Sequence, residues 1–159
     1  MENKISNKKI LDHVNKQNKW CRYKKESPIL AKKLYNDIVV ETLEGNITCH
    51  ADNFLCRGSF NDIWCQKAES LFQEYIPDVL TENDYDGWQK YLPKPDSIGV
   101  LAVAVDHDFE VYLRDWGILK GIAGSYLIKM YTDKENEYPD NIWIVQKKIF
   151  ESTYRKYIK

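Results

Sequence analysis

The stretch that decides the fold runs from Glu41 to Tyr75 and reads ETLEGNITCHADNFLCRGSFNDIWCQKAESLFQEY. In it, short runs of β-branched and aromatic residues alternate with Gly, Asn and Asp, which is typical of strands joined by tight turns. Together with the residues just before it, the stretch predicts four strands and then a helix, at residues 38–43, 47–49, 54–57, 63–66 and 68–75. We therefore expect a small antiparallel sheet closed by a short helix.

A weaker copy of this pattern follows in the second half of the chain. At a shift of 72 residues, Gly45, Ala51 and residues 54–57 become Gly117, Ala123 and residues 126–129. After a longer loop the shift is 79, and Ile63, Trp64, Leu71 and Tyr75 become Ile142, Trp143, Phe150 and Tyr154. Two shifts that differ by one loop insertion are what a duplicated unit would leave. The sequence therefore predicts an internal repeat.

The predicted organisation has four parts. Residues 1–19 form a helical lead-in, with a helix over residues 8–17 that Ser6 can cap; residues 20–76 form the first β-rich repeat; residues 77–87 are an acidic linker; residues 88–159 form the second, diverged repeat. Within the first repeat, residues 29–34 follow Pro28 and are expected to form an edge strand or a short helix. The fold class is α+β, with two tandem β-rich repeats that pack together because a unit of this size has a marginal core alone.

Three short motifs suggest a family. Residues 42–45 read T-L-E-G, residues 57–58 read R-G, and residues 150–154 read F-E-S-T-Y. The first two, followed by residues 71–75 in the same copy, and the third, which closes the second copy, resemble segments of small bacterial and bacteriophage proteins built around a Pro-Gly-Asp-Tyr motif. Residues 51–54 (A-D-N-F) and 123–126 (A-G-S-Y) stand where that motif would fall, so both copies depart from it. The resemblance implies a fold unit and a bacterial or phage setting. The family has no established biochemical activity, so no catalytic residue is implied.

The charge is unevenly spread, although the net charge is only −1. Residues 1–36 carry ten Lys/Arg against three Asp/Glu, and residues 146–159 carry five against one, whereas residues 37–87 carry two against eleven. Without a wider basic stripe, nucleic acid is an unlikely partner. No apolar run approaches the roughly 18 residues of a membrane helix. We expect a cytoplasmic protein, monomeric or homodimeric, with no membrane association.

The cysteines predict neither a metal site nor a disulfide. Cys21, Cys49, Cys56 and Cys65 include no C-x2–4-C pair of the kind that usually binds zinc. In a cytosolic protein, cysteines are thiols by default, so we expect buried core thiols. No cofactor is expected, because no nucleotide-binding or metalloprotease motif occurs.

The candidate functional residues fall into two groups. Asp106, His107 and Asp108 follow an apolar strand, and a histidine between carboxylates can act as a general base, although a polar turn is the commoner role. Amphipathic side chains near the interface between the repeats are candidates for ligand binding: Arg57, Trp64, Trp143 and Tyr154.

These observations favour a non-catalytic binding or regulatory protein that holds a small ligand or a protein partner between its repeats. The first alternative is a small hydrolase acting on a nucleotide-like substrate, with His107 and Asp106 or Asp108 as the base. The second alternative is a nucleic-acid-binding accessory protein that uses the two basic ends. Whether the protein is an enzyme is left open, and the absence of a catalytic signature argues against it.

Overall fold

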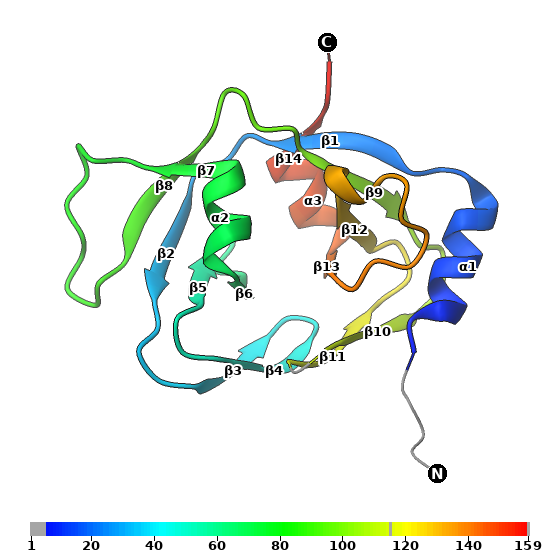
Figure 1. Cartoon of the computed structure of the whole chain (residues 1–159), viewed down its shortest axis with the longest axis horizontal. Coiled ribbons are helices and arrows are strands. Elements are labelled where there is room, and N and C mark those ends of the chain that lie inside the picture. Colours follow the sequence, from blue (N-terminus) through cyan, green and yellow to red (C-terminus); the bar gives the residue numbers. More distant parts are fainter. Residues whose placement is uncertain (1–5, 115, 159) are drawn as a thin grey trace.

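The computed structural model describes residues 6–114 and 116–158, and these form a β-rich α+β fold. The described part has three α-helices and three antiparallel sheets (Figure 1). The helices are α1 (Lys8–Gln17), α2 (Ala68–Glu74) and α3 (Lys147–Thr153), and a single 3-10 turn, η1, covers Tyr131–Asp133. The predicted fold class is therefore confirmed at the level of α+β.

The first sheet has the strand order β6-β5-β2-β8-β7. Its strands are β2 (Ile29–Lys33), β5 (Phe54–Arg57), β6 (Ile63–Gln66), β7 (Tyr75–Pro77) and β8 (Gln89–Pro93). Leu71 of α2 is fully buried against this sheet, in one cluster with Ile29 and Phe54. The helix thus covers the sheet through a single apolar face.

The second sheet has the order β13-β12-β9-β1-β14. Its strands are β1 (Cys21–Lys25), β9 (Val100–Ala104), β12 (Tyr126–Met130), β13 (Ile142–Val145) and β14 (Tyr154–Lys156). Phe150 of α3 packs on this sheet, and its ring stacks on Tyr126 and Tyr154 at centroid distances of 3.9 and 4.6 Å.

A third sheet lies along the lower edge of Figure 1 and joins the two halves. Its order is β10-β11-β4-β3, with strands β3 (Ile38–Thr42), β4 (Gly45–Cys49), β10 (Phe109–Leu113) and β11 (Gly117–Gly121). The hairpins β3–β4 and β10–β11 meet edge to edge. Thr48 N–H donates to Trp116 O at 2.8 Å, and Lys120 N–H donates to Glu44 O at 2.6 Å. This joining sheet was not expected from the sequence.

The sheets do not follow the predicted boundaries of 20–76 and 88–159, because the two halves exchange one strand. β1 precedes the first sheet in the chain but pairs with β9 and β14 of the second sheet. β8, from the second half, pairs with β2 and β7 of the first sheet. Each half therefore completes the sheet of the other. In the segment predicted as a linker, Pro77 belongs to β7 and Asp78 N–H donates to Lys90 O at 2.9 Å.

The first and second sheets have the same strand order and register. In the first, Phe54 lies opposite Lys33 and Gln66; in the second, Tyr126 lies opposite Ala104 and Val145. Likewise, Tyr75 lies opposite Pro93, and Tyr154 lies opposite Lys25. The core clusters of the two sheets also correspond. The first sheet and α2 contribute Ile29, Ala31, Phe54, Cys56, Leu71, Tyr75 and Tyr91; the second sheet and α3 contribute Val100, Ala102, Ile128, Phe150 and Tyr154, with the partly buried Tyr23 and Tyr126 packed against them.

The predicted helix over residues 8–17 agrees with α1. Its buried face carries Ile10, Leu11 and Val14, which join the largest core cluster. Asn7 fixes its start: the Asn7 amide donates to Tyr112 O at 2.8 Å, and Tyr112 N–H donates to Asn7 Oδ1 at 2.6 Å. Asn7, not the predicted Ser6, is the N-cap residue; Ser6 lies one position earlier, and its Oγ accepts a hydrogen bond from Lys8 N–H at 3.1 Å.

The prediction for residues 29–34 was wrong, because β2 is the central strand of its sheet. Pro28 lies just before the strand rather than within it. Its missing N–H therefore removes no hydrogen bond from either ladder.

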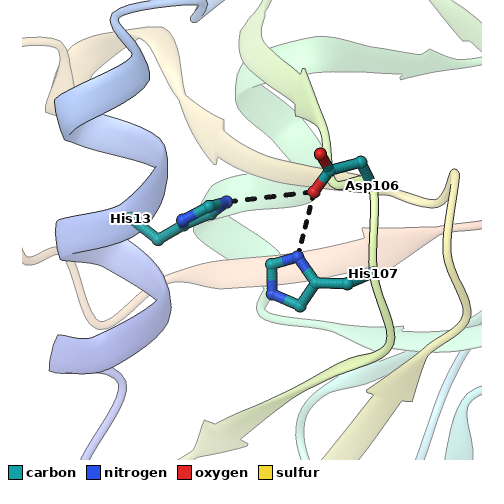
Figure 2. A group of neighbouring side chains, drawn as sticks. All are labelled: His13, Asp106 and His107. Atoms are coloured by element: carbon teal, nitrogen blue, oxygen red, sulfur yellow. Dashed lines mark hydrogen bonds and ion pairs between the residues drawn. The ribbon is translucent and has the colours of Figure 1, made fainter.

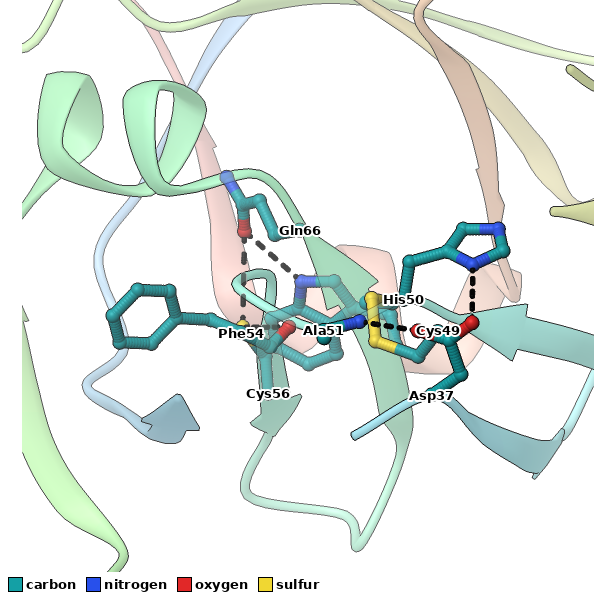
Figure 3. Close-up of a disulfide and its surroundings, with 9 residues drawn as sticks. Asp37, Cys49, His50, Ala51, Phe54, Cys56 and Gln66 are labelled. Atoms are coloured by element: carbon teal, nitrogen blue, oxygen red, sulfur yellow. Dashed lines mark hydrogen bonds and ion pairs between the residues drawn. A yellow bond between two sulfur atoms is a disulfide. The ribbon is translucent and has the colours of Figure 1, made fainter. Parts of the chain in front are cut away.

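The prediction of four thiols was also wrong, because Cys49 and Cys65 form a disulfide (Figure 3). It ties the end of β4, in the joining sheet, to β6 at the edge of the first sheet. Cys21 and Cys56 are free, and burial raises the pKa of Cys56 to about 12. The second half has Gly121 and Ile144 at the equivalent positions, so sequence comparison between the halves concealed the pair.

Two glycines at the central junction yield the first prediction. Gly45 and Gly117 have φ of +137° and +132°, and a Cβ on them would lie 2.9 Å from Ile118 O and 3.1 Å from Asn46 O. We expect Gly45→Ala and Gly117→Ala each to lower the unfolding free energy by about 2–3 kcal/mol, from backbone strain plus this close approach.

The matched control is Gly87→Ala, because Gly87 also has a positive φ (+85°) but has nothing within 4 Å of its Cβ position. Gly87→Ala should lower the unfolding free energy, measured by urea unfolding, by only about 1 kcal/mol. Equal losses at all three positions would contradict the close approach of the hairpins.

The disulfide yields the second prediction. The two cysteines are 16 positions apart in the sequence. A disulfide that closes a loop of this length raises the unfolding free energy by about 3 kcal/mol, because it restricts the unfolded chain. The double variant Cys49→Ala/Cys65→Ala should lose about that much in urea unfolding, whereas Cys21→Ala should change little. Four reactive thiols in the oxidised, unfolded wild type would show that the bond does not form.

Candidate functional site

The principal cavity has a volume of about 620 Å³ and lies between the first sheet, the second sheet and the joining sheet. Both halves line it with equivalent residues. Trp64 on β6 and Trp143 on β13 contribute indole rings, and Tyr75 and Tyr154 stand at the first positions of β7 and β14. The cavity thus lies where the sequence places the interface between the halves.

The two tyrosines form deeply buried parts of the wall. Tyr75 is 6% exposed and Tyr154 is 8% exposed. Burial raises the pKa of both hydroxyl groups well above the usual value, so both remain neutral at physiological pH. On the first-half side, the Trp64 indole N–H donates to Gln66 Oε1 at 3.1 Å, which fixes the ring. This part of the wall is therefore aromatic and neutral, and the Trp64 ring is held in place.

Lys25 places a single amine against this aromatic wall. It comes from the exchanged strand β1 and lies opposite Tyr154 in the ladder. Its Nζ is 4.3 Å from the centroid of the Trp64 ring and 5.6 Å from that of Tyr154. Burial lowers its pKa from 10.5 to about 8, and the charge of Asp62 partly opposes that shift. Among the described residues, Lys25 makes no ion pair with a carboxylate.

Three carboxyl groups also line the cavity, those of Glu44, Glu74 and Asp140. Burial, followed by repulsion from Asp62, raises the pKa of Glu44 to about 7. Burial also raises the pKa of Glu74, against the effect of hydrogen bonds from Ser97 and Gly99. Within the described part of the chain, Glu74 Oε1 is buried without a hydrogen-bond partner. At neutral pH the cavity thus offers the largely protonated Lys25 amine and two carboxyl groups, Glu44 and Glu74, with a reduced tendency to ionise. Lys67 and Arg114 also line it.

The structure brings together three of the four predicted ligand-binding residues. Trp64, Trp143 and Tyr154 line the cavity, whereas Arg57 does not. The Arg57 guanidinium lies 4.6 Å from the centroid of the Trp88 ring, a stacking arrangement that stabilises the fold.

The predicted catalytic candidates lie outside the cavity, in the turn between β9 and β10. His107 Nδ1 lies 3.0 Å from Asp106 Oδ1, and both residues are exposed. Asp108 Oδ1 accepts a hydrogen bond from Ala123 N–H at 2.9 Å, which is a turn-stabilising role. The cluster gains a member from α1, because His13 Nε2 is 4.0 Å from Asp106 Oδ1.

Sequence reasoning missed Lys25 and His13. The signal for Lys25 was alternation, because Cys21, Tyr23 and Lys25 point to one face of β1 and Tyr23 lies against the core. A lysine on the inward face of a strand marks an internal charge. His13 had no such signal, since its neighbours are distant in the sequence.

Comparison with known proteins gives no relative. No protein-family model matches the chain, and neither the curated proteins nor the solved structures contain a significant match. The resemblance to Pro-Gly-Asp-Tyr proteins therefore stays a prediction. In residues 6–114 and 116–158, the helices are all too short or too polar to cross a membrane.

The Lys25 amine yields the third prediction. Because its pKa is lower in the folded state, its burial as an ammonium destabilises the protein, and this cost is relieved as pH rises from about 8 towards 10.5. Between pH 7.5 and 9.5, the unfolding free energy of the wild type should therefore rise by about 2 kcal/mol relative to Lys25→Met. Urea unfolding at both pH values measures this difference. Parallel pH profiles for the two proteins would contradict the burial of Lys25.

Proposed function

We propose that the protein is a non-catalytic binding protein that holds a small amphipathic anion in the cavity between its two halves. The observation that carries the proposal is the Lys25 amine, which faces an aromatic wall and has no carboxylate ion-pair partner among the described residues. Lys25 is half-buried, and a cation held partly away from water is costly unless something pairs with it. A bound anion would supply that partner.

The dimensions and lining of the cavity support a ligand of this kind. A volume of about 620 Å³ falls within the range of small-molecule sites. The faces of Trp64 and Trp143 suit an apolar or aromatic body, and Lys25 suits a carboxylate, sulfonate or phosphate at one end. Because the pKa of Lys25 is about 8, the amine is mostly charged at neutral pH. The ligand would therefore combine a flat apolar part with a single acidic group.

We also propose that the two halves arose by duplication. Support comes from the equal strand order, the equal registers and the matching core clusters of the two sheets. The cavity is not symmetric, however, because Pro93 holds the position in β8 that Lys25 holds in β1. An acid-binding amine against the aromatic wall of one half, without a counterpart in the other half, would favour one orientation of the ligand.

The origin, the oligomeric state and the cellular location are also proposals. A bacterial or phage origin rests on the motif resemblance, and a monomer or homodimer on size. Cytoplasmic location has an argument against it, because a disulfide such as Cys49–Cys65 persists best under oxidising conditions. The hydrolase alternative loses support because Asp106 and His107 lie apart from the cavity.

The nucleic-acid alternative has one specific observation in its favour. The two basic ends meet, since β1 and β14 pair with Lys24 opposite Arg155 and Tyr23 opposite Lys156. Arg22 lies between the rings of Tyr131 and Tyr157, at 3.6 and 3.5 Å. A salt-dependent DNA or RNA titration would support this second function, and flat titrations would remove it.

The fourth prediction tests the cavity with two probes of similar ring systems. The anionic dye 8-anilinonaphthalene-1-sulfonate and the neutral N-phenyl-1-naphthylamine both fluoresce when they enter an apolar site. We expect both to bind the wild type, because the cavity wall is aromatic. Lys25→Met should weaken binding of the anionic probe at least tenfold, because only this probe pairs with the amine. The affinity for the neutral probe should stay within twofold of the wild-type value.

Lys24→Met is the matched control, because Lys24 is the neighbour of Lys25 on β1 and its amine donates to Pro95 O at the surface. This variant should bind both probes as the wild type does. The proposed pairing would be contradicted if the two lysine variants lost equal affinity for the anionic probe. It would also be contradicted if Lys25→Met lost equal affinity for both probes.

A further inference from the structure

A second group of side chains lies away from the cavity, where α1 passes the turn between β9 and β10. Figure 2 shows His13 from the helix and Asp106 and His107 from the turn pointing toward one another. One ligand atom from each residue lies within 4.8 Å of the others. The rings of His13 and His107 meet edge to face at 4.9 Å between centroids. Two imidazoles and a carboxylate thus converge from elements that are far apart in the sequence.

The spacing suits a divalent ion. Zinc holds nitrogen and oxygen ligands at about 2.0–2.2 Å, so neighbouring ligand atoms of a tetrahedral site are about 3.4 Å apart. The distances from Asp106 Oδ1 to His107 Nδ1 and to His13 Nε2 are 3.0 and 4.0 Å, on either side of that value. Small rotations of these side chains, moving the ligand atoms by a fraction of an ångström, would bring both distances close to the tetrahedral value.

Hydrogen bonding already presents the ligand atoms in a suitable form. The Gln17 amide nitrogen lies 3.2 Å from His13 Nε2, and because an amide nitrogen donates, Nε2 accepts with its lone pair. His107 Nδ1 faces Asp106 Oδ1 across a proton, and a metal ion would replace that proton between the same two atoms. The Gln17 contact is the one that an incoming ion would displace.

We propose that His13, Asp106 and His107 form a site for a divalent transition metal, with zinc as the leading case. Imidazole with one carboxylate favours zinc, copper and nickel over magnesium or calcium. Three protein ligands leave a fourth position for water. Asp106 and Gln17 also border a shallow hollow of about 380 Å³ on the second sheet.

A bound ion would have a structural effect as well as a chemical one. α1 packs on the core through Ile10, Leu11 and Val14, and His13 lies on the same helix beside the last of these. Coordination of His13 together with the β9–β10 turn would pin the helix to the second sheet. Metal binding should therefore stabilise the folded chain.

The fifth prediction uses tag-free protein and Zn²⁺ itself as the probe. Isothermal titration at pH 7.5 should give one Zn²⁺ per chain, with binding at least tenfold weaker in His13→Gln and in His107→Gln. Zn²⁺ should raise the thermal midpoint of the wild type but not that of either variant. Circular dichroism confirms that each variant is folded, and Asp106→Asn, at an exposed position, provides a further ligand deletion that should weaken binding.

His50→Gln is the matched control, because His50 is the one histidine of the sequence outside the cluster. It also lies near a carboxylate, with Nδ1 3.3 Å from Asp37 Oδ2 (Figure 3). It should bind Zn²⁺ within twofold of the wild type. The proposal fails if the wild type does not bind Zn²⁺ at micromolar to millimolar concentrations. It fails equally if His50→Gln weakens binding as much as the two cluster variants do.

Discussion

The exchange of β1 and β8 between the two outer sheets is the constraint on which the rest of the structure depends. Without β1, the second sheet would lose the strand that joins β9 to β14; without β8, the first sheet would lose the strand that joins β2 to β7. Backbone groups left unpaired in a packed sheet cost more free energy than a side chain on its surface can return. The halves are therefore held together by backbone hydrogen bonds and not only by packed side chains, and the cavity between them has walls that cannot simply drift apart.

The same exchange delivers the charge to the cavity. Lys25 reaches the aromatic wall only because β1 crosses to the second sheet, next to Tyr154. The protein stabilises this amine weakly, through the faces of Trp64 and Tyr154. A cation over an aromatic ring gains about 0.5–2 kcal/mol, less than the cost of burying an unpaired charge. The rest of the fold must therefore offset this imbalance, and a perturbed group of this kind is common at functional sites.

Local features of the fold could be predicted from the sequence, and long-range ones could not. The helix at residues 8–17 and the strands at 54–57 and 63–66 were placed correctly because periodicity and turn residues define them within a few positions. The central place of β2, the joining sheet and the Cys49–Cys65 bond depend on which strands pair, and strand pairing leaves no signal in one sequence. The predicted repeat drew attention to Trp64, Trp143 and Tyr154, which line the cavity, whereas it gave no reason to single out Lys25 or His13.

The strand exchange also has a consequence for how the chain is made. A polypeptide leaves the ribosome from its N-terminus, so β1 emerges long before its partners β9 and β14, with Tyr23 paired to Lys156 near the far end. The first sheet likewise waits for β8 to close its gap between β2 and β7. Contacts so distant in sequence form slowly, because the ordering of a long loop must precede them. The nascent chain must therefore carry β1 unpaired until β9 and β14 have been made, and the charged side chains of β1, Arg22 and Lys24, suit a strand that has to stay in solution during that time.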